Sequence, residues 1–200
     1  MLIIAGQTWV AHSLMLRPLW LPPGVSGALL VASIAVYESV DEPGPLSRLL
    51  SASFSAVLVA ANAASLVLLV EGVFIGSRLS AAGLLTTGLA LWVADVAVFA
   101  LLYWELDGGG VESRAAGYPE RYPDLVFPQH QADQQGIAPP AWKPRFYDYV
   151  YVSLTSAIAF SPTDAMPYTL RAKLVMGAEN VLSFATLAVV VARAVNIAHG

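Results

Sequence analysis

Long uninterrupted apolar stretches constrain the fold of this 200-residue chain more than any other feature of its sequence. A helix needs about 20 apolar residues to cross the roughly 30 Å hydrocarbon core of a bilayer, because each residue advances it by about 1.5 Å. Three stretches reach that length, at about 49–73, 82–104 and 174–197. The sequence therefore predicts a protein whose helices cross a membrane.

Two further apolar stretches precede these three. Residues 24–37 are bounded by prolines and by a turn at 41–45, and they could span the bilayer with some thinning or tilt. Residues 1–16 fit a further span, an interfacial helix or the end of a helix begun further upstream. A signal peptide fits less well, because no basic residue precedes the apolar part. We expect an all-α, polytopic membrane helix bundle with four or five transmembrane helices.

The composition supports this class and argues against others. Hydrophobic residues make up 57% of the chain and charged residues 12%, about half the charged fraction of an ordinary soluble protein. The net charge of −4 argues against a nucleic-acid partner. Without cysteine there is no thiol nucleophile or thiolate metal site, and the histidines are scattered. We predict no cofactor, no metal site and no enzymatic activity.

Three parts of the chain differ in composition. Residues 1–104 contain the N-terminal transmembrane helices. Residues 105–145 are rich in glycine, glutamine and proline and are predicted to be an exposed loop. A loop of this length either carries function or covers helix ends. Residues 146–200 contain a short apolar helix, a polar turn and the final transmembrane helix.

The short apolar stretch at 147–160 has about 14 residues, which is too few for a comfortable span. The four residues after it, 161–164, are called the elbow below. They cannot continue the helix cleanly, because Pro162 lacks an amide hydrogen. Non-helical backbone at membrane depth is tolerated only where protein or a water-filled cavity surrounds it. The pattern is typical of a pore loop and predicts a re-entrant, pore-loop-like helix.

This segment resembles the pore helix, filter and inner helix of potassium channels. Ser153 matches the pore-helix serine, and Lys173 matches a basic residue at the start of the inner helix. Pro167 and Thr169 complete a D-x-x-P-x-T pattern that begins at Asp164. The positions aligned with the filter and the aspartate after it are Ala159, Phe160, Ser161, Pro162, Thr163 and Asp164. The resemblance implies a homo-tetramer that passes small ions along its axis.

The same positions lack the glycines that the potassium filter requires. That filter points backbone carbonyls inward and needs glycines able to adopt positive φ. Ser161 and Thr163 replace both glycines, and Pro162 fixes φ near about −65°. We expect a ring of hydroxyls, backed by Asp164, that passes partly hydrated ions with weak selectivity. The alternative is a non-conducting membrane scaffold or accessory subunit in which the elbow only packs.

Most of the chain also resembles a bacterial integral-membrane family defined by domain of unknown function 1345. The shared motifs are WELDGGG at the start of the loop, FPQ, FSPTD at the elbow and ARAVNI near the end. This resemblance implies a multi-pass protein of the bacterial inner membrane, with the lipid bilayer as its surroundings. It implies no particular activity.

Two acids, Asp95 and Glu179, lie well inside predicted transmembrane helices. Asp95 is near the middle of its span, where a charge costs about 2.5–3.5 kcal/mol and needs a partner, a cavity or neutralisation. It either stays protonated and bonds a neighbouring helix, or faces water and takes part in ion or proton movement. The last helix carries four residues on one face at helical spacing: Glu179, Ser183, Thr186 and Val190. This stripe lines a pore below the filter or forms a seam between helices.

Two arguments on membrane orientation disagree. The channel resemblance places residues 105–145 outside the cell, whereas seven basic residues on that side against three on the other favour the cytoplasm. We follow the resemblance and expect a reporter fused after Gly200 to lie in the cytoplasm. A reporter active only on the outer side of the membrane would reverse this orientation.

Overall fold

The computed structural model describes residues 45–75, 81–110, 114, 123–129, 142–162 and 164–199. Within these ranges the chain is mostly helical, as the sequence predicts. The spans expected at 1–16 and 24–37 lie outside the described residues, and so does Thr163 of the elbow. Two helical segments, Leu85–Gly109 and Leu170–Ala192, are long and apolar enough to cross a membrane. The corresponding apolar stretch of the preceding helix is shorter, Ala56–Val67.

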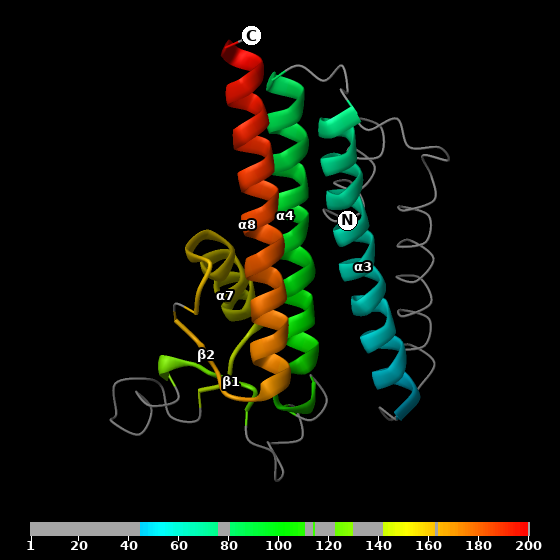
Figure 1. The fold of residues 1–200 in the computed structure, drawn as a ribbon. Coiled ribbons are helices and arrows are strands. Elements are labelled where there is room, and N and C mark those ends of the chain that lie inside the picture. Colours follow the sequence, from blue (N-terminus) through cyan, green and yellow to red (C-terminus); the bar gives the residue numbers. More distant parts are fainter. Residues whose placement is uncertain are drawn as a thin grey trace. The chain divides into compact units, whose positions relative to one another are not determined.

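The described residues contain three long α-helices, one shorter α-helix, one 3-10 helix and two very short strands (Figure 1). In chain order they are α3 (Pro45–Ile75), α4 (Ala81–Leu106), η1 (Asp107–Gly109), β1 (Leu125–Val126), α7 (Phe146–Ala159), β2 (Met166–Pro167) and α8 (Leu170–His199). The all-α expectation omitted the strands, which pair antiparallel with Leu125 opposite Pro167. Two-residue strands carry no alternating apolar pattern that could predict them.

The chain forms two compact units, and α4 and α8 contribute residues to both. Unit 1 consists of Met1–Val98 and Leu182–Gly200, and unit 2 consists of Phe99–Val181. Each unit is described separately below.

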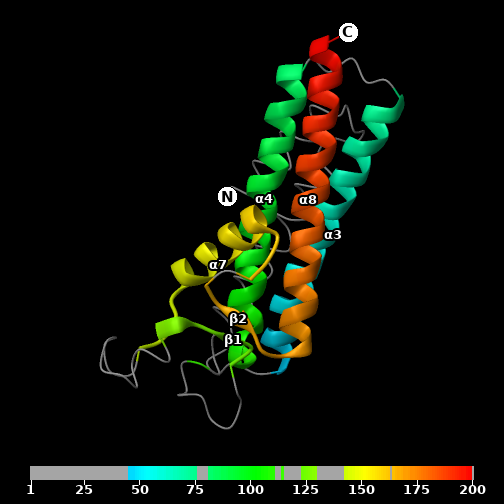
Figure 2. The same cartoon turned by 60° about the vertical axis from the view of Figure 1, so that its left-hand side comes forward.

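Unit 1 packs α3, the first part of α4 and the last part of α8 through apolar side chains. Leu58, Leu66 and Leu91 are buried there. At one point α8 comes very close to α4, because a Cβ atom built on Gly88 would lie 2.3 Å from Cγ2 of Val190. Figures 1 and 2 both show the two helices side by side. The missing side chain of Gly88 therefore permits this close approach.

Unit 2 is organised around α7, which lies next to the two strands (Figure 2). The helix begins after Arg145, whose backbone N–H donates to the carboxylate of Asp148 at 2.6 Å. It ends at Phe160, whose φ of 54° is left-handed and stops the helical ladder. Its buried residues follow helical spacing: Tyr149, Val152, Ser153, Ser156 and Ala157. The opposite face, which includes Tyr147 and Ile158, is exposed.

Several residues of the segment 105–145, which was predicted to be an exposed loop, are buried where the structure describes them. Asp107, Asp124, Leu125 and Phe127 are buried, and so is Arg114. Its polar composition suggested contact with water, but the polar groups bond to one another inside unit 2 instead. The prediction of an exposed loop is therefore corrected for these residues.

The close approach at Gly88 yields a matched test of packing. We expect Gly88→Ala to lower the free energy of unfolding by about 1–3 kcal/mol, because the new methyl group overlaps Val190. Gly177→Ala is the control, since nothing lies within 4 Å of a Cβ atom there and alanine favours a helix by up to about 1 kcal/mol. Denaturant unfolding in detergent, followed by circular dichroism, measures both. Equal effects would contradict the close approach.

Candidate functional site

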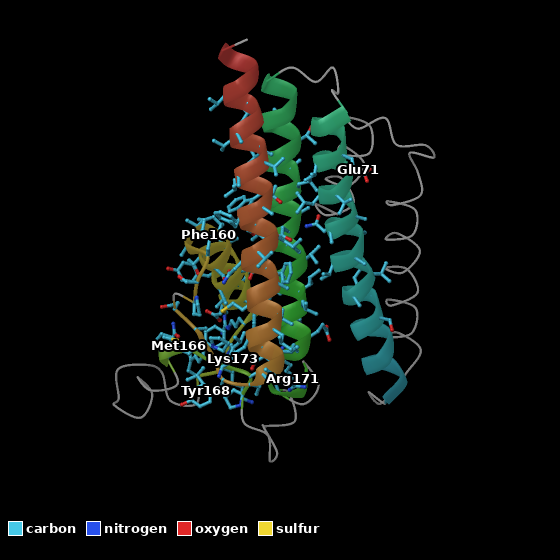
Figure 3. The ribbon with its side chains drawn as sticks, viewed as in Figure 1. Glu71, Phe160, Met166, Tyr168, Arg171 and Lys173 are labelled. Atoms are coloured by element: carbon cyan, nitrogen blue, oxygen red, sulfur yellow. The ribbon has the colours of Figure 1, made fainter. Side chains whose placement is uncertain are left out.

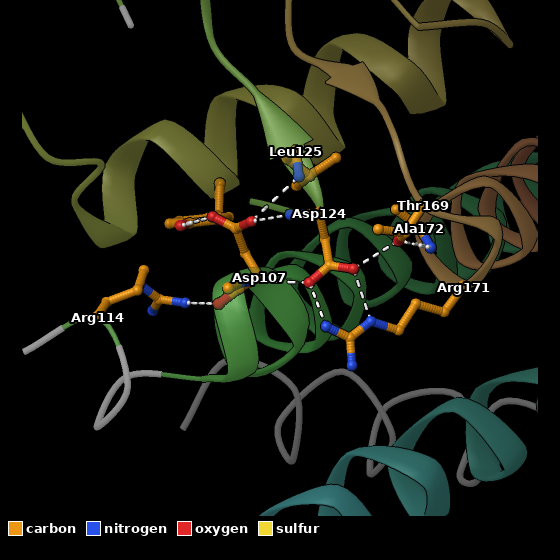
Figure 4. Close-up of polar contacts among 9 residues, drawn as sticks. Asp107, Arg114, Asp124, Leu125, Thr169, Arg171 and Ala172 are labelled. Atoms are coloured by element: carbon orange, nitrogen blue, oxygen red, sulfur yellow. Dashed lines mark hydrogen bonds and ion pairs between the residues drawn. The ribbon is translucent and has the colours of Figure 1, made fainter. Parts of the chain in front are cut away.

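The side chain of Asp107, directly after α4, accepts hydrogen bonds from two other parts of unit 2 (Figure 4). Its Oδ1 accepts the backbone N–H groups of Asp124 and Leu125 at 2.8 and 3.0 Å. Its Oδ2 accepts the phenolic O–H of Tyr149, on α7, at 2.6 Å. The side chain is fully buried, and both of its oxygens are satisfied. Asp107 therefore ties the end of α4 to β1 and α7.

Asp124 is the second buried carboxylate of this network. Its Oδ1 accepts Nε–H of Arg171 at 2.6 Å and the hydroxyl of Thr169, and its Oδ2 accepts Nη2–H of Arg171. Oδ2 also accepts the amide of Gly108 at 3.0 Å, where a φ of 60° turns the chain back. Two parallel bonds from a guanidinium to a carboxylate are the strongest geometry for such a pair. We call Asp107, Asp124 and their partners the aspartate hub.

The charge state of Asp124 follows from these contacts. Burial alone would raise the pKa of this carboxyl, because it disfavours the charged form. The hydrogen bonds from Arg171 and Thr169, the positive charge of Arg171 and the Gly108 amide outweigh burial and hold the pKa below the ordinary value of 3.8. Asp124 is therefore ionised at neutral pH and paired with Arg171, whose side chain is 47% exposed.

Aromatic rings enclose the hub on the side of α7. The ring of Tyr149 meets those of Trp104 and Phe127 edge to face, with centroids 5.3 and 5.4 Å apart. The Arg114 guanidinium lies 4.5 Å from the Trp104 ring centroid, in cation–π contact, and donates to the backbone carbonyl of Asp107. These rings cover the hub on this side and limit the access of water to it.

Both ends of the segment that contains α7 are bound to the hub. The start of α7 is bound to Asp107 through Tyr149, while the backbone N–H of Tyr168, after β2, donates to the Asp124 carbonyl at 2.8 Å. Residues 146–167 thus leave the hub and come back to it, and we call them the α7 hairpin. Figure 3 labels Phe160 near the far end and Arg171 near the hub.

The elbow residues lie at the far end of this hairpin. Ser161 and Pro162 are exposed, and Asp164 is half-buried. Ala159 and Phe160 before them are also exposed. Among the described elbow residues, no side chain is sealed inside its own chain, so their oxygens remain available to solvent or to another molecule.

Glu179 lies at the centre of a second polar cluster in unit 2. Its side chain is fully buried, and its two carboxyl oxygens accept the hydroxyls of Tyr103 and Ser153. The neighbouring Asn180 accepts the Ser156 hydroxyl through Oδ1 at 2.8 Å. These contacts hold α7 and the last turn of α4 against α8. We call this the Glu179 cluster.

Asp95 forms a third polar cluster, in unit 1. The side chain is 2% exposed, and its carboxyl oxygens accept Nδ2–H of Asn62 at 2.9 Å and the Ser183 hydroxyl at 2.8 Å. Asn62, Asp95 and Ser183 come from α3, α4 and α8, so this polar cluster joins all three helices. We call it the Asp95 cluster.

The four residues of the predicted pore-lining stripe all lie inside the chain. Glu179 and Ser183 bond to other helices, Thr186 donates to the backbone carbonyl of Leu182 at 2.8 Å, and Val190 packs at Gly88. All four are buried. The contacts described for the stripe are thus made within the chain, and the elbow is the exposed part of the predicted site.

Sequence reasoning missed most partners in these clusters. Asn62, Asp107 and Asp124 were not predicted as site residues, although Asn62 is a lone amide in an apolar stretch. The WELDGGG motif contains Asp107 and could have marked a helix end that needs a fixed turn. Among the described residues, no group of three or more acids and histidines could hold a metal ion.

Comparisons with protein-family models, curated proteins and solved structures find no match for this chain. The case for a function therefore depends on the contacts and exposures above. In the hub, the acid Asp124 is paired with a base. In the Glu179 and Asp95 clusters, the donors described for the acid are neutral.

The hub predicts a specific dependence on Asp124. We expect Asp124→Asn to lower the free energy of unfolding by about 2–3 kcal/mol at neutral pH, because charge-assisted bonds to a buried carboxylate are lost. The lowered pKa means that this stabilisation is present above about pH 4 and disappears as pH falls through the folded-state pKa. Denaturant unfolding at several pH values measures it.

Asp148→Asn is the matched control, because that carboxylate is only partly buried and its described bond is to a neighbouring backbone amide. Asp148→Asn should lower the free energy of unfolding by about 1 kcal/mol or less. An Asp124→Asn protein that is as stable as the control at neutral pH would contradict the structural role of the hub.

Proposed function

We propose that this chain is a multi-pass protein of the bacterial inner membrane that conducts small ions, with the α7 hairpin as its pore loop. The observation that carries the proposal is the return of the hairpin to the hub from which it starts. Such a segment enters and leaves on one side, as a re-entrant loop does.

The depth of the hairpin supports this interpretation. Ser156, near the end of α7, bonds to Asn180, which lies nine residues beyond Arg171 on α8. Nine residues of helix correspond to about 14 Å, and half of a hydrocarbon core is about 15 Å. A hub at the membrane surface would therefore place the elbow near the middle of the bilayer.

Exposed apolar side chains on α8 support a membrane setting. Leu174, Val181, Phe184 and Val191 are each more than half exposed, and all belong to a segment long enough to span. A large apolar surface of this kind suits lipid or another helix rather than water. With α4 as a second span, and with the predicted spans in the first 73 residues, we propose four or five transmembrane helices.

The elbow supplies the chemistry proposed for conduction. In a homo-tetramer, four exposed Ser161 hydroxyls and four Asp164 carboxylates would surround one axis. Rings of hydroxyl and carboxylate oxygens favour cations that keep part of their hydration shell. Because Ser161 and Pro162 replace filter residues, we propose weak selectivity among monovalent cations rather than preference for potassium.

A second function is favoured by the buried stripe of α8. Glu179 and Ser183 bond within the chain, so they do not present a polar wall to a neighbouring copy. A final helix whose stripe residues Glu179 and Ser183 bond within their own chain suits a non-conducting membrane scaffold or accessory subunit. In that case the elbow contacts a partner protein, and the oligomer lacks an aqueous axis.

Planar-bilayer recording of the purified protein distinguishes the two functions. We expect cation currents that fall several-fold in Asp164→Asn and change in Ser161→Ala, because both groups line the proposed passage. Asp148→Asn, at the hub end of α7, is the matched control and should leave the currents unchanged. Silence across voltages and salts, or equal currents in all variants, would favour the scaffold. Chemical cross-linking in native membranes should show a tetramer in the first case.

A further inference from the structure

The Asp95 cluster contains a buried acid whose described hydrogen-bond donors are both neutral. Asn62 Nδ2–H and the Ser183 hydroxyl donate to its two carboxyl oxygens at 2.9 and 2.8 Å. The basic side chains that the structure describes all belong to unit 2, so the described part of unit 1 supplies no positive charge to this carboxyl. Two neutral donors stabilise a carboxylate without cancelling its charge, and such a charge is costly in an apolar interior. An un-ionised carboxyl avoids that cost.

The charged side chains described nearest to the cluster along its three helices are acids. On α3 and α4 they are Glu71 and Glu105, nine residues after Asn62 and ten residues after Asp95. On α8 it is Glu179, four residues before Ser183. A neighbouring acid favours the un-ionised form of a carboxyl, whereas a base would favour the ionised form. The helices of the cluster therefore provide a setting in which a proton is retained.

Asn62 indicates where that proton lies. Its side chain is 6% exposed, and its Oδ1 atom has no hydrogen-bond donor among the described residues. Oδ1 and Nδ2 are attached to the same carbon, so the unpartnered oxygen lies beside the carboxyl group that Nδ2 contacts. Native proteins contain few buried acceptors without a partner. A donor is therefore expected on the Asp95 carboxyl, next to this oxygen.

A proton on Asp95 is such a donor. An un-ionised carboxyl carries one O–H donor and keeps an acceptor oxygen, and an amide likewise has a donor and an acceptor end. When the carboxyl O–H donates to Asn62 Oδ1 and the other carboxyl oxygen accepts Asn62 Nδ2–H, the two side chains form a closed ring of two hydrogen bonds. Every polar group of the pair then has a partner. An ionised Asp95 leaves Asn62 Oδ1 without one.

We propose that Asp95 is a proton-binding site, whose carboxyl is un-ionised in the folded protein at neutral pH and forms an acid–amide ring with Asn62. The shared proton joins α4 to α3, while Ser183 joins the same carboxyl to α8. Loss of the proton opens one bond of the ring and leaves a buried charge among three helices. The packing of unit 1 therefore depends on pH. The site uses none of the elbow residues, and it does not depend on whether the protein conducts ions.

Infrared spectroscopy of the full chain in detergent detects the proton directly. An un-ionised carboxylic acid has a C=O stretching band that an ionised carboxylate lacks. Labelling the side-chain carboxyl of aspartate with the heavy carbon isotope shifts the bands of aspartate and leaves those of glutamate in place. At neutral pH we expect a label-sensitive C=O band in the wild type that loses the intensity of one carboxyl in Asp95→Asn. Equal bands in the two proteins, or no band in either, overturn the proposal.

Asn62→Leu tests whether the proton is shared with the amide. This variant keeps the buried carboxyl but removes both bonds of the ring. We expect the C=O band of Asp95 to remain and to move to higher frequency, because hydrogen bonds to a carboxyl lower its stretching frequency. A band at the wild-type frequency would show that the proton is not shared with Asn62, and would overturn the ring.

Denaturant unfolding in detergent at several pH values, followed by circular dichroism, measures the consequence for stability. At neutral pH the unfolded chain has an ionised Asp95, whereas the folded chain keeps the proton, so stability falls as pH rises. The unfolding equilibrium constant of the wild type should increase about tenfold per pH unit relative to that of Asp95→Asn. The asparagine amide can form the same ring with Asn62 but has no proton to release.

Glu71→Gln is the matched control for the pH dependence, because this acid is exposed on α3 in the same unit. It should keep the wild-type dependence on pH. Equal dependence in the wild type and Asp95→Asn overturns the proposal and leaves a water molecule as the partner of Asn62 Oδ1. A dependence that Glu71→Gln removes also overturns it, because the proton then binds elsewhere. Silence in planar bilayers has no bearing on these results.

Discussion

The paired carboxylates of the aspartate hub are the interaction on which unit 2 depends. Asp107 and Asp124 are fully buried, and each of their side-chain oxygens receives at least one hydrogen bond. Burial of two acids is tolerated only because Arg171, backbone amides and hydroxyls satisfy them. Without these bonds the hairpin would lose its base at the hub, although the Glu179 cluster would still join α7 to α4 and α8.

The three polar clusters use different means to hold an acid inside the protein. Near the chain turns, Asp124 is paired with a guanidinium that is still partly exposed to water. Along the apolar helices, the donors described for Glu179 and Asp95 are hydroxyls and an amide. Long basic side chains are costly to bury in hydrocarbon, whereas small neutral donors fit between helices. The acid near a chain turn is thus paired with a base, whereas the donors described for the two acids on helices are neutral.

Sequence reasoning predicted the periodic features and missed the aperiodic ones. The short helix was expected at 147–160 and is found at Phe146–Ala159, because apolar spacing and Pro162 define its limits. The same spacing showed that Glu179 and Ser183 share a face, but it does not say whether water or another helix covers that face. Asp124 pairs with residues more than 40 positions away, and no local pattern encodes such a contact.

The large separation between hub partners also sets the order of assembly during synthesis. Asp124 is made 47 residues before Arg171, and Tyr103 is made 76 residues before Glu179. At about 5–20 residues per second, a nascent chain carries Asp124 without its guanidinium for roughly 2–9 seconds. During this interval Asp124 has no guanidinium partner and must stay hydrated. The α7 hairpin therefore cannot pack against the hub before the ribosome has delivered the start of α8. The rate of translation therefore sets how long unit 2 stays incompletely folded before its last helix, α8, is synthesised.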